Sequence, residues 1–399
     1  MRIALASPYD WSVPGGVNRH VANLAEHYMR RGHDVKVIAP SSKRMRVQPD
    51  YLHIIGHSSI GLPASGSVAN ITLSYNLGPR VKAYLAREPF DVVHIHEPFM
   101  PLLPFQFVRY SRSTTVATFH AARDTGSRIY AYTRFIIEPW WQNIDGRIAH
   151  SRAALKLIGT YFAARYRVIP SGIDYAFFAS EAPPMPQFMD GKRNIVFVGR
   201  QEQRKGLPYL IEAFAILKKE MPDTRLIVVG PDGGLRAACI RYIAEHDVKD
   251  VVFTDFVPYE DLPRYYKSAD VFCAPNTGHE SLGLIILEAM AAGVPIVATR
   301  IQGFQDVLSE GVHGLLVPPK DIYALCEALK RMLSDAAMRE EMGRAGSRAA
   351  RAYSWEEMSG RVLQMYEDTA NGHAQVGRGR SPGIDSSVGQ GPSLDRRAD

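Results

Sequence analysis

The chain has few cysteines and no pattern that pairs them. Its 399 residues include only Cys239, Cys273 and Cys326, with no Cys-x-x-Cys among them. The sequence therefore predicts neither a disulfide framework nor a cysteine-based zinc site, and a reducing cytoplasm suits it. The first residues run directly into an apolar strand pattern without a charged leader or a cleavage site, so we expect a cytoplasmic protein without a signal peptide.

Long uninterrupted apolar runs are also missing. The most apolar window, residues 281–299, has the length of a membrane span, but Glu288 lies in its middle and Gly293 and Pro295 interrupt it. This pattern predicts a buried helix, a turn and a buried strand instead. The chain carries no helix-turn-helix, zinc-finger or aromatic–glycine RNA-binding signature, so we expect no nucleic-acid partner.

Positive charge is concentrated in the first half of the chain. Residues 1–170 carry 21 Lys and Arg against 10 Asp and Glu, whereas the remainder carries 26 against 31. The excess has two interpretations, a solvated basic face or a surface that meets an anionic partner such as a membrane or a phosphorylated ligand. Many of these cations lie in residues 30–46. Residues 80–87 carry both cations and apolar side chains, a pattern typical of a helix that lies on a membrane surface.

Two successive series of strand–helix alternation divide the chain. Strands are expected at residues 2–6, 35–39, 92–95, 115–119, 147–149 and 167–169, and again at 194–198, 225–229, 251–253, 270–274, 295–299 and 314–317. This alternation predicts an α/β protein with two doubly wound parallel sheets. The expected organisation is an N-terminal domain at 1–170, a linker at 171–192, a C-terminal domain at 193–353, a helix at 354–370 and a disordered tail at 371–399.

Glycine and polar residues follow several of the expected strands. Gly15 and Gly16 come after the first strand, Glu97 after the third and His120 after the fourth. In open parallel sheets, ligands bind beyond the carboxyl ends of the strands. Gly15-Gly16 before a helix is consistent with a phosphate at the helix N-terminus, or with a tight turn that requires glycine.

A cationic loop opens the second domain. Residues 199–206 place Arg200 and Lys205 between a strand and a helix. Such cations neutralise the negative charge that develops on a diphosphate leaving group, in place of a metal ion. No Asp-x-Asp occurs anywhere in the sequence, so the usual acidic bridge between a metal and a diphosphate is missing. The alternative is an exposed basic loop without a ligand.

Residues 276–293 form the most specific segment of the chain. Glu280 and Glu288 lie eight residues apart, which on one helix would place both on the same face. Glu288 interrupts an otherwise apolar stretch, so its charge needs a partner. The partner is either a group of the protein itself or the vicinal hydroxyls of a ligand.

Two histidines raise the question of a metal ion. His94 and His96 are two apart on an expected strand and therefore share one side of it. No third ligand is evident from the sequence. We therefore predict no metal site and no required cofactor.

Taken together, these motifs resemble the group 1 retaining glycosyltransferases of GT-B architecture. The resemblance rests on the Glu-x7-Glu segment from Glu280 to Glu288, the loop from Gly199 to Gly206, Pro170–Asp174 and Ser354-Trp355-Glu356. It covers nearly the whole chain up to about residue 370. It implies two facing Rossmann-like domains with a cleft between them, an N-terminal acceptor domain and a C-terminal nucleotide-sugar domain.

Within that family, the sequence is similar to the actinobacterial phosphatidylinositol mannosyltransferases, which use GDP-mannose. The segments that carry this similarity are 7–17, 94–98 and 117–120. The resemblance implies a nucleotide-sugar co-substrate and a lipid-linked or polyol-phosphate acceptor, at the inner face of the membrane. The implied catalytic residues are His120, Arg200, Lys205 and Glu280, the donor-binding residues are Gly15, Gly16, Arg200, Lys205, Glu280, Ser281, Leu282, Gly283 and Glu288, and the acceptor-binding residues are Tyr9, Glu97 and His120.

Three departures from that group lie on the acceptor side. Asn70 stands where the group has arginine, Phe99 where it has asparagine, and Ala121 where it has threonine. The donor chemistry therefore carries over better than phosphatidylinositol as acceptor. The alternatives are a glycosyltransferase that uses UDP-glucose or UDP-N-acetylglucosamine with a soluble acceptor, and a non-catalytic protein that binds a nucleotide sugar.

Overall fold

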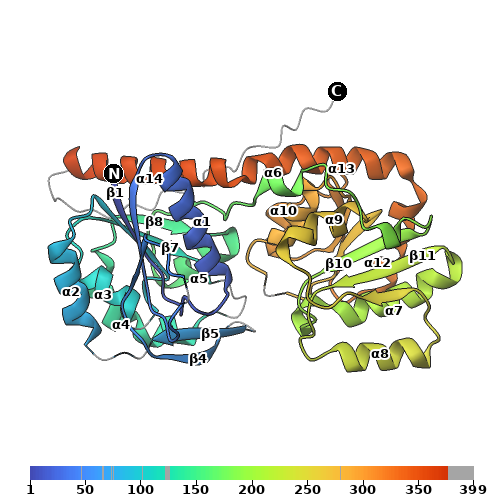
Figure 1. The fold of residues 1–399 in the computed structure, drawn as a ribbon, viewed down its shortest axis with the longest axis horizontal. Helices are drawn as coiled ribbons and strands as arrows, with labels where there is room; N and C mark the ends of the chain where they lie inside the picture. The colour runs from blue at the N-terminus through green and yellow to red at the C-terminus, as the bar shows by residue number, and fades with distance from the viewer. Residues whose placement is uncertain are drawn as a thin grey trace. The chain divides into compact units, whose positions relative to one another are not determined.

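The computed structural model describes residues 1–375 except residues 46, 65–66, 73, 75, 101, 122–125 and 279. The chain forms two compact units (Figure 1). Unit 1 comprises Met1–Gly172 and the chain from Trp355 onward, and unit 2 comprises Ile173–Ser354. The segment expected to be a linker belongs mostly to unit 2, because Ile173, Phe178 and Phe188 are buried in the core of that unit.

Unit 1 is built on a seven-stranded parallel sheet. Its strands are β1 (Arg2–Ala6), β2 (Asp34–Ala39), β3 (Leu52–Ile54), β6 (Val92–His96), β7 (Thr114–Phe119), β8 (Gly146–Ala149) and β9 (Arg167–Val168). They lie in the order β3-β2-β1-β6-β7-β8-β9. The chain reverses its direction of winding between β1 and β6, where open α/β sheets bind their ligands. An antiparallel hairpin of β4 (Ser59–Ala64) and β5 (Ser67–Thr72) stands beside this sheet.

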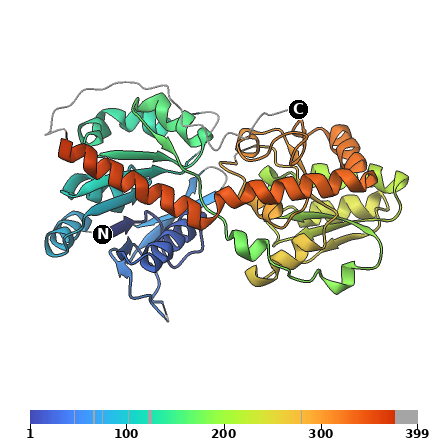
Figure 2. The same cartoon turned by 90° about the horizontal axis from the view of Figure 1, so that it is seen from above.

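Helices cover both faces of this sheet. Those on one face are α1 (Gly16–Arg30) and α14 (Trp355–Gln375), and those on the other are α2 (Leu77–Arg87), α3 (Leu103–Tyr110), α4 (Arg128–Trp141) and α5 (Arg152–Tyr161). Figure 2 shows α14, the last and reddest helix, running across unit 1. Its apolar stripe, which includes Met358, Val362 and Tyr366, is buried against the sheet. This helix continues to Gln375, so residues 371–375, which were expected to belong to a disordered tail, are helical. The rest of the expected tail, residues 376–399, lies outside the described residues.

Unit 2 repeats the doubly wound plan with six parallel strands. They are β10 (Arg193–Val198), β11 (Thr224–Val229), β12 (Val251–Phe253), β13 (Val271–Ala274), β14 (Ile296–Thr299) and β15 (Gly314–Val317), in the order β12-β11-β10-β13-β14-β15. The helices are α6 (Tyr175–Phe178), α7 (Leu207–Glu220), α8 (Arg236–Glu245), α9 (Leu262–Lys267), α10 (Leu284–Ala291), α11 (Gln302–Gln305), α12 (Ile322–Ser334) and α13 (Ala336–Ala350). Here the winding reverses between β10 and β13.

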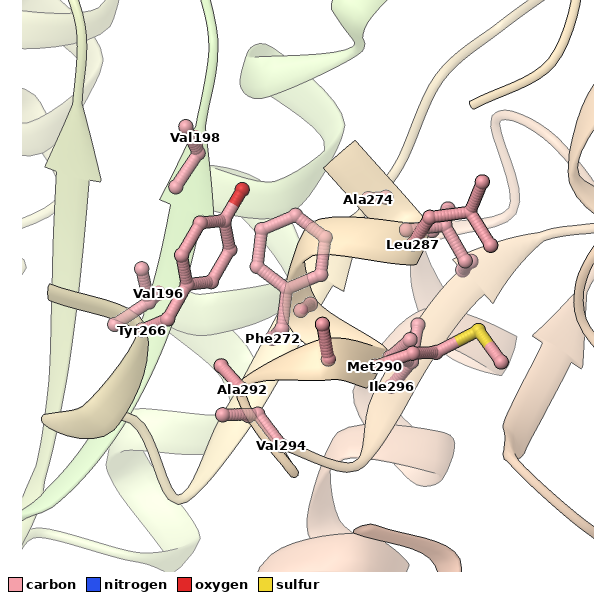
Figure 3. Packing of buried hydrophobic residues seen from close by; sticks show 14 of the residues in the cluster. Val196, Val198, Tyr266, Phe272, Ala274, Leu287, Met290, Ala292, Val294 and Ile296 are labelled. Atoms are coloured by element: carbon pink, nitrogen blue, oxygen red, sulfur yellow. The ribbon is translucent and has the colours of Figure 1, made fainter. Parts of the chain in front are cut away.

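The core of unit 2 fills both faces of its sheet. On one face, Tyr266 of α9 packs beside Val196 of β10 and Phe272 of β13, with a ring-centroid distance of 5.4 Å between the two aromatic side chains (Figure 3). The opposite face is covered by α7, α8 and α12. The window that was long enough for a membrane span forms the buried helix α10, a glycine turn and the buried strand β14, as predicted. Among the described residues, no helix is long and apolar enough to cross a membrane.

Candidate active site

One group of candidate site residues lies in unit 1, where β1 leads into α1. Gly15 is the N-cap of α1 with an extended backbone, φ −162°, and Gly16 is its first residue. Neither glycine has a left-handed φ, and a Cβ added at either position would contact nothing within 4 Å. Neither a tight turn nor internal packing therefore requires glycine here. The open space lies at the amino end of a 15-residue helix, whose free N–H groups attract anions.

Glu97 connects the ends of β6 and β7. Its carboxylate oxygen Oε1 accepts hydrogen bonds from the backbone N–H groups of His120, at 2.6 Å, and Ala121, at 2.7 Å. A side-chain hydrogen bond from Tyr130 also reaches it. Glu97 is buried, which raises its pKa, while these hydrogen bonds act in the opposite direction. The carboxylate expected to bind an acceptor therefore holds the loop that carries His120.

Tyr9 lies close to this carboxylate. Burial raises the pKa of Tyr9 well above its usual value, and the negative charge of Glu97 adds to the shift. The phenol therefore stays protonated at neutral pH and keeps its hydrogen-bond donor. Tyr9, Glu97 and His120 are thus brought together in unit 1 at the switch point of the sheet, where the sequence expected an acceptor.

His120, which is half-buried, lies against a group of buried histidines that the sequence did not predict. His96 Nδ1 lies 2.9 Å from His120 Nε2, and the rings of His20 and His150 lie 5.1 Å and 4.9 Å from that of His120. Burial lowers the pKa of His96 and His120 well below the usual range, and the neighbouring imidazoles add to this effect. Both side chains are therefore neutral at pH 7.

His94 lies next to this group, with its ring centroid 4.3 Å from that of His96, but its ring nitrogens have other partners. Its Nδ1 lies 2.6 Å from the Tyr366 hydroxyl and its Nε2 lies 2.7 Å from Thr118 Oγ1, so both ring nitrogens are engaged. His94 and His96 do lie side by side, as their spacing predicted, but His94 has no ring nitrogen left for a further ligand. The histidines that join His96 come from α1 and from the ends of β7 and β8, which spacing along a single strand does not reveal.

A separate group of candidate site residues lies in unit 2, beyond β10 and β13. Lys205 Nζ donates to Glu280 Oε2 at 2.7 Å, and both side chains are largely buried. Asn276 Nδ2 donates to the same oxygen at 3.0 Å, and Arg204 Nη1 lies 3.4 Å from it. Three donors therefore converge on one carboxylate oxygen at the switch point of this sheet. Asn276 and Arg204 were not among the expected site residues, although both lie inside the two motifs.

Arg200 takes a different direction. Its side chain is 65% exposed, and its guanidinium Nε lies 3.7 Å from Glu202 Oε1. The structure thus joins Lys205 but not Arg200 to Glu280. The 3₁₀ turn of residues 203–205 explains this, since it carries Arg204 and Lys205 toward the end of β13 while Arg200 stays at the start of the loop.

The two glutamates of the Glu-x7-Glu segment do not share a helix. Gly283 has a left-handed φ of 73° and caps α10, which begins only at Leu284. A Cβ at Gly283 would lie 2.6 Å from Phe304, so both conformation and packing require glycine there. The expectation that Glu280 and Glu288 lie on one helical face is therefore wrong. Ser281 and Leu282 belong to the loop, with Leu282 buried.

Glu288 has a partner within the protein. Its Oε2 accepts a hydrogen bond from the Tyr266 hydroxyl at 2.9 Å. Burial raises the pKa of Tyr266 far above its usual value, and the Glu288 charge adds to the shift, so the phenol remains a donor. The half-buried charge thus has at least one internal hydrogen bond, and a carboxylate has further lone pairs for a ligand.

Comparison with known proteins identifies the family. The pattern described as "Glycosyl transferases group 1" matches residues 181–349, and that described as "Glycosyltransferase Family 4" matches residues 14–177. The chain is 35% identical to a phosphatidyl-myo-inositol mannosyltransferase of Mycobacterium leprae, over 94% of this chain and 99% of the relative. It is 33% identical to the enzyme of that name in Mycolicibacterium smegmatis, over 98% and 100%. The chain belongs to the group 1 glycosyltransferases.

Solved structures agree on the architecture. A sucrose-phosphate synthase from Thermosynechococcus elongatus has a TM-score of 0.69 at 22% identity, covering 93% of this chain and 99% of that one. A glycosyltransferase from Rickettsia africae has a TM-score of 0.74 at 17% identity, covering 92% and 98%. The protein is a glycosyltransferase with the GT-B fold, as its two doubly wound sheets and the resemblance predicted.

Proposed function

We propose that this glycosyltransferase moves mannose from GDP-mannose to a hydroxyl group of a polyol-phosphate acceptor of the phosphatidylinositol class, with retention of the anomeric configuration. The choice of sugar and acceptor is supported by the names of relatives that match nearly the full chain at 30–36% identity. The choice of a retaining reaction rests on the Glu-x7-Glu resemblance.

The main structural support for this proposal is the set of donors, including Lys205, that surround the carboxylate of Glu280. Lys205 and Glu280 are held together at 2.7 Å beyond two adjacent strands. In the proposed complex, the Lys205 ammonium faces the donor diphosphate and Glu280 accepts hydrogen bonds from sugar hydroxyls. The cation then stabilises the negative charge that grows on the diphosphate as the glycosidic bond breaks.

We further propose a front-face displacement. The acceptor hydroxyl attacks the anomeric carbon from the side on which the diphosphate departs, and a diphosphate oxygen takes the hydroxyl proton. Glu280 is engaged by Lys205 and Asn276, so it serves as a positioning and electrostatic group and not as a nucleophile. In unit 1, the protonated Tyr9 phenol donates to the acceptor, and neutral His120 contacts the transferred sugar.

A transfer assay tests this proposal. The enzyme is incubated with phosphatidylinositol and, in parallel, with GDP-mannose, UDP-glucose or UDP-N-acetylglucosamine, and the product anomer is read by nuclear magnetic resonance. We expect product from GDP-mannose with the α-configuration of the donor retained. A β-linked product would contradict the retaining mechanism, and transfer only from a UDP-sugar would contradict the donor assignment.

A second candidate acceptor is a soluble inositol phosphate. The chain is 40% identical over 179 residues to a D-inositol 3-phosphate glycosyltransferase of Corynebacterium urealyticum, over 43% of this chain and 42% of the relative. Such an acceptor shares the inositol-phosphate group but lacks a lipid. Adding soluble inositol phosphate to the same assay separates the two candidates, because only one of them requires a membrane.

Exposed side chains on two helices of unit 1 bear on whether the acceptor lies at a membrane surface. The cations Arg80, Lys82 and Arg87 of α2 are exposed, as expected, but Val81 and Tyr84 pack into the core, so the apolar face of this helix does not reach solvent. The exposed apolar face belongs to α4 instead, where Tyr132, Phe135 and Ile136 are 80%, 78% and 68% exposed at helical spacing. We propose that this stripe enters the interface of an anionic membrane, while exposed cations of unit 1, such as Arg134 of the same helix, attract the lipid headgroups.

A further inference from the structure

Three histidines from separate elements of unit 1 meet at one point. His20 comes from α1, His96 from the end of β6 and His120 from the residue after β7. One ring nitrogen of each lies within 4.8 Å of those of the other two, and no other such group of metal-ligating side chains occurs in the described ranges. His20 and His96 are buried.

The spacing is close to that of a three-histidine metal site. Zn–N bonds of about 2.1 Å at tetrahedral angles separate ligand nitrogens by roughly 3.4 Å. The 2.9 Å between His96 Nδ1 and His120 Nε2 is already shorter than this, and the widest separation within the triad exceeds it by little more than 1 Å. Small rotations of the imidazole rings would bring all three nitrogens to bonding distance.

One nitrogen in this cluster is left without a partner. His96 Nε2 is buried, and no hydrogen bond reaches it from any part of the chain that the structure describes. An unpaired buried polar atom costs about 1–3 kcal/mol. His96 therefore retains bonding capacity that no described residue uses.

Neighbouring groups orient the triad. His20 Nδ1 is paired with Ser171 Oγ at 2.8 Å, which leaves its Nε2 for an ion. The backbone of His120 is held by Glu97 Oε1. Contacts of this kind fix ring orientation and tautomer in metal sites and contribute to their affinity.

We propose that His20, His96 and His120 form a binding site for a divalent transition-metal ion, with Zn²⁺ the best match. Neutral imidazoles favour zinc, cobalt, nickel and copper, whereas magnesium and calcium prefer oxygen ligands. The three histidines leave a fourth coordination position for water. The bound ion is inhibitory, because it occupies His120, which the proposed function assigns to the transferred sugar; this consequence rests on that function, whereas binding does not.

Spectroscopy on the full chain tests binding without reference to activity. Co²⁺ is titrated into protein that lacks a polyhistidine tag, and the visible absorption of tetrahedral cobalt is recorded before competition with Zn²⁺. We expect one Co²⁺ per chain, displaced by Zn²⁺. A lack of cobalt absorption together with no Zn²⁺ binding by calorimetry would overturn the proposal.

A series of variants locates the site. His96→Ala should abolish the signal, and Ser171→Ala should weaken Zn²⁺ binding by about tenfold or more. His246→Ala, a control for an exposed histidine of unit 2, should bind as the wild type does. Near-ultraviolet thiolate absorption, or wild-type affinity in His96→Ala, would place the ion elsewhere and contradict the assignment. Circular dichroism verifies that each variant is folded.

The transfer assay tests whether the bound ion inhibits the enzyme. Micromolar Zn²⁺ should inhibit the wild type, and EDTA should restore the rate. Spectroscopic binding without inhibition would retain the site and reject the assigned role of His120. An enzyme without transferase activity that still binds cobalt would refute the proposed function and leave the metal site in place.

Discussion

At the scale of single residues, Lys205 is the cation most firmly placed for donor chemistry. It is held by Glu280 at 2.7 Å in a largely buried position. We expect Lys205→Ala to reduce kcat/KM by about 2–4 kcal/mol in transition-state stabilisation, or roughly 30-fold to 1,000-fold, because an uncompensated leaving-group charge remains. Steady-state kinetics measure this loss. Lys249→Ala, which removes an exposed lysine of the same unit, is the matched control, and equal rates in both variants would exclude the proposed role.

Glu288 allows stability to be separated from binding. Its Oε2 accepts from the Tyr266 hydroxyl, and Glu288→Gln keeps a neutral oxygen as acceptor. We therefore expect the unfolding free energy to change by about 1 kcal/mol or less. If Glu288 binds the donor, as the resemblance implies, GDP affinity should fall by about 2 kcal/mol through loss of a charged hydrogen bond. Calorimetric titration with GDP and urea unfolding measure the two effects. Unchanged GDP affinity would mean that Glu288 accepts the hydrogen bond from Tyr266 but does not bind the donor.

The site residues differ in how far local sequence could predict them. The Lys205 and Glu280 motifs lie beyond adjacent parallel strands, so the rule for ligand sites in α/β sheets predicted that they would lie close together. The expectation that Glu280 and Glu288 share one helical face was wrong, because α10 begins only after Gly283. The histidine cluster was missed, since its members come from separate elements and are united only by the packing of the sheet.

At the scale of elements, α4 is the structure's strongest candidate for a membrane contact. We expect Phe135→Gln to weaken co-sedimentation with phosphatidylinositol or phosphatidylglycerol vesicles, because burying one aromatic side chain contributes about 1.5–3 kcal/mol. Phe256→Gln is the control, since Phe256 is 73% exposed on unit 2. Binding should also fall at high salt and be weak with neutral lipid. An active enzyme that binds no anionic vesicles at low salt would favour a soluble acceptor.

Strands were easier to predict than their surroundings. The predicted strands of both sheets agree with the structure to within one residue at each end, because buried parallel strands are short continuous apolar runs bounded by turns. The three-residue strand β3 and the β4–β5 hairpin were missed. Their segment, residues 52–72, is rich in glycine and serine and lacks such a run. The burial of Val81 and Tyr84 was also missed, since an amphipathic pattern does not state what covers its apolar face.

At the scale of the whole molecule, unit 1 should be the acid-sensitive part. Burial lowers the pKa of His94 to about 3 and that of His150 to about 4, and lowers those of three further histidines, His20, His96 and His120. The folded state keeps these groups neutral, whereas the unfolded chain protonates them below about pH 6.5. Their contribution to stability is therefore complete above pH 6.5 and is lost as pH falls toward the folded pKa values.

Tryptophan fluorescence measures this loss in unit 1 alone. All four tryptophans lie in that unit: Trp11, Trp140, Trp141 and Trp355. In buffer with EDTA, we expect the urea midpoint to fall between pH 7.5 and 5.5, because the free energy of unfolding decreases by up to about 1.4 kcal/mol per histidine for each pH unit below 6.5. His94→Gln removes one titrating group and should make the dependence shallower. A midpoint independent of pH would mean that these histidines have the same pKa in the folded and unfolded states, which would contradict the prediction.

The effect of EDTA on the transfer rate depends on residues of both units. In the proposed reaction, Lys205 balances the diphosphate charge, and the sequence has no Asp-x-Asp to hold Mg²⁺ or Mn²⁺ beside it. EDTA should therefore leave the transfer rate nearly unchanged in protein freed of transition metals. In protein purified with Zn²⁺ bound to the histidine triad, EDTA should raise the rate, because His120 is released. Mg²⁺-saturated EDTA separates the two sites, since it still removes Zn²⁺ but leaves Mg²⁺ in solution. A rate that collapses with EDTA and returns only on addition of Mn²⁺ or Mg²⁺ would mean that the cations of unit 2 do not replace a metal ion at the diphosphate.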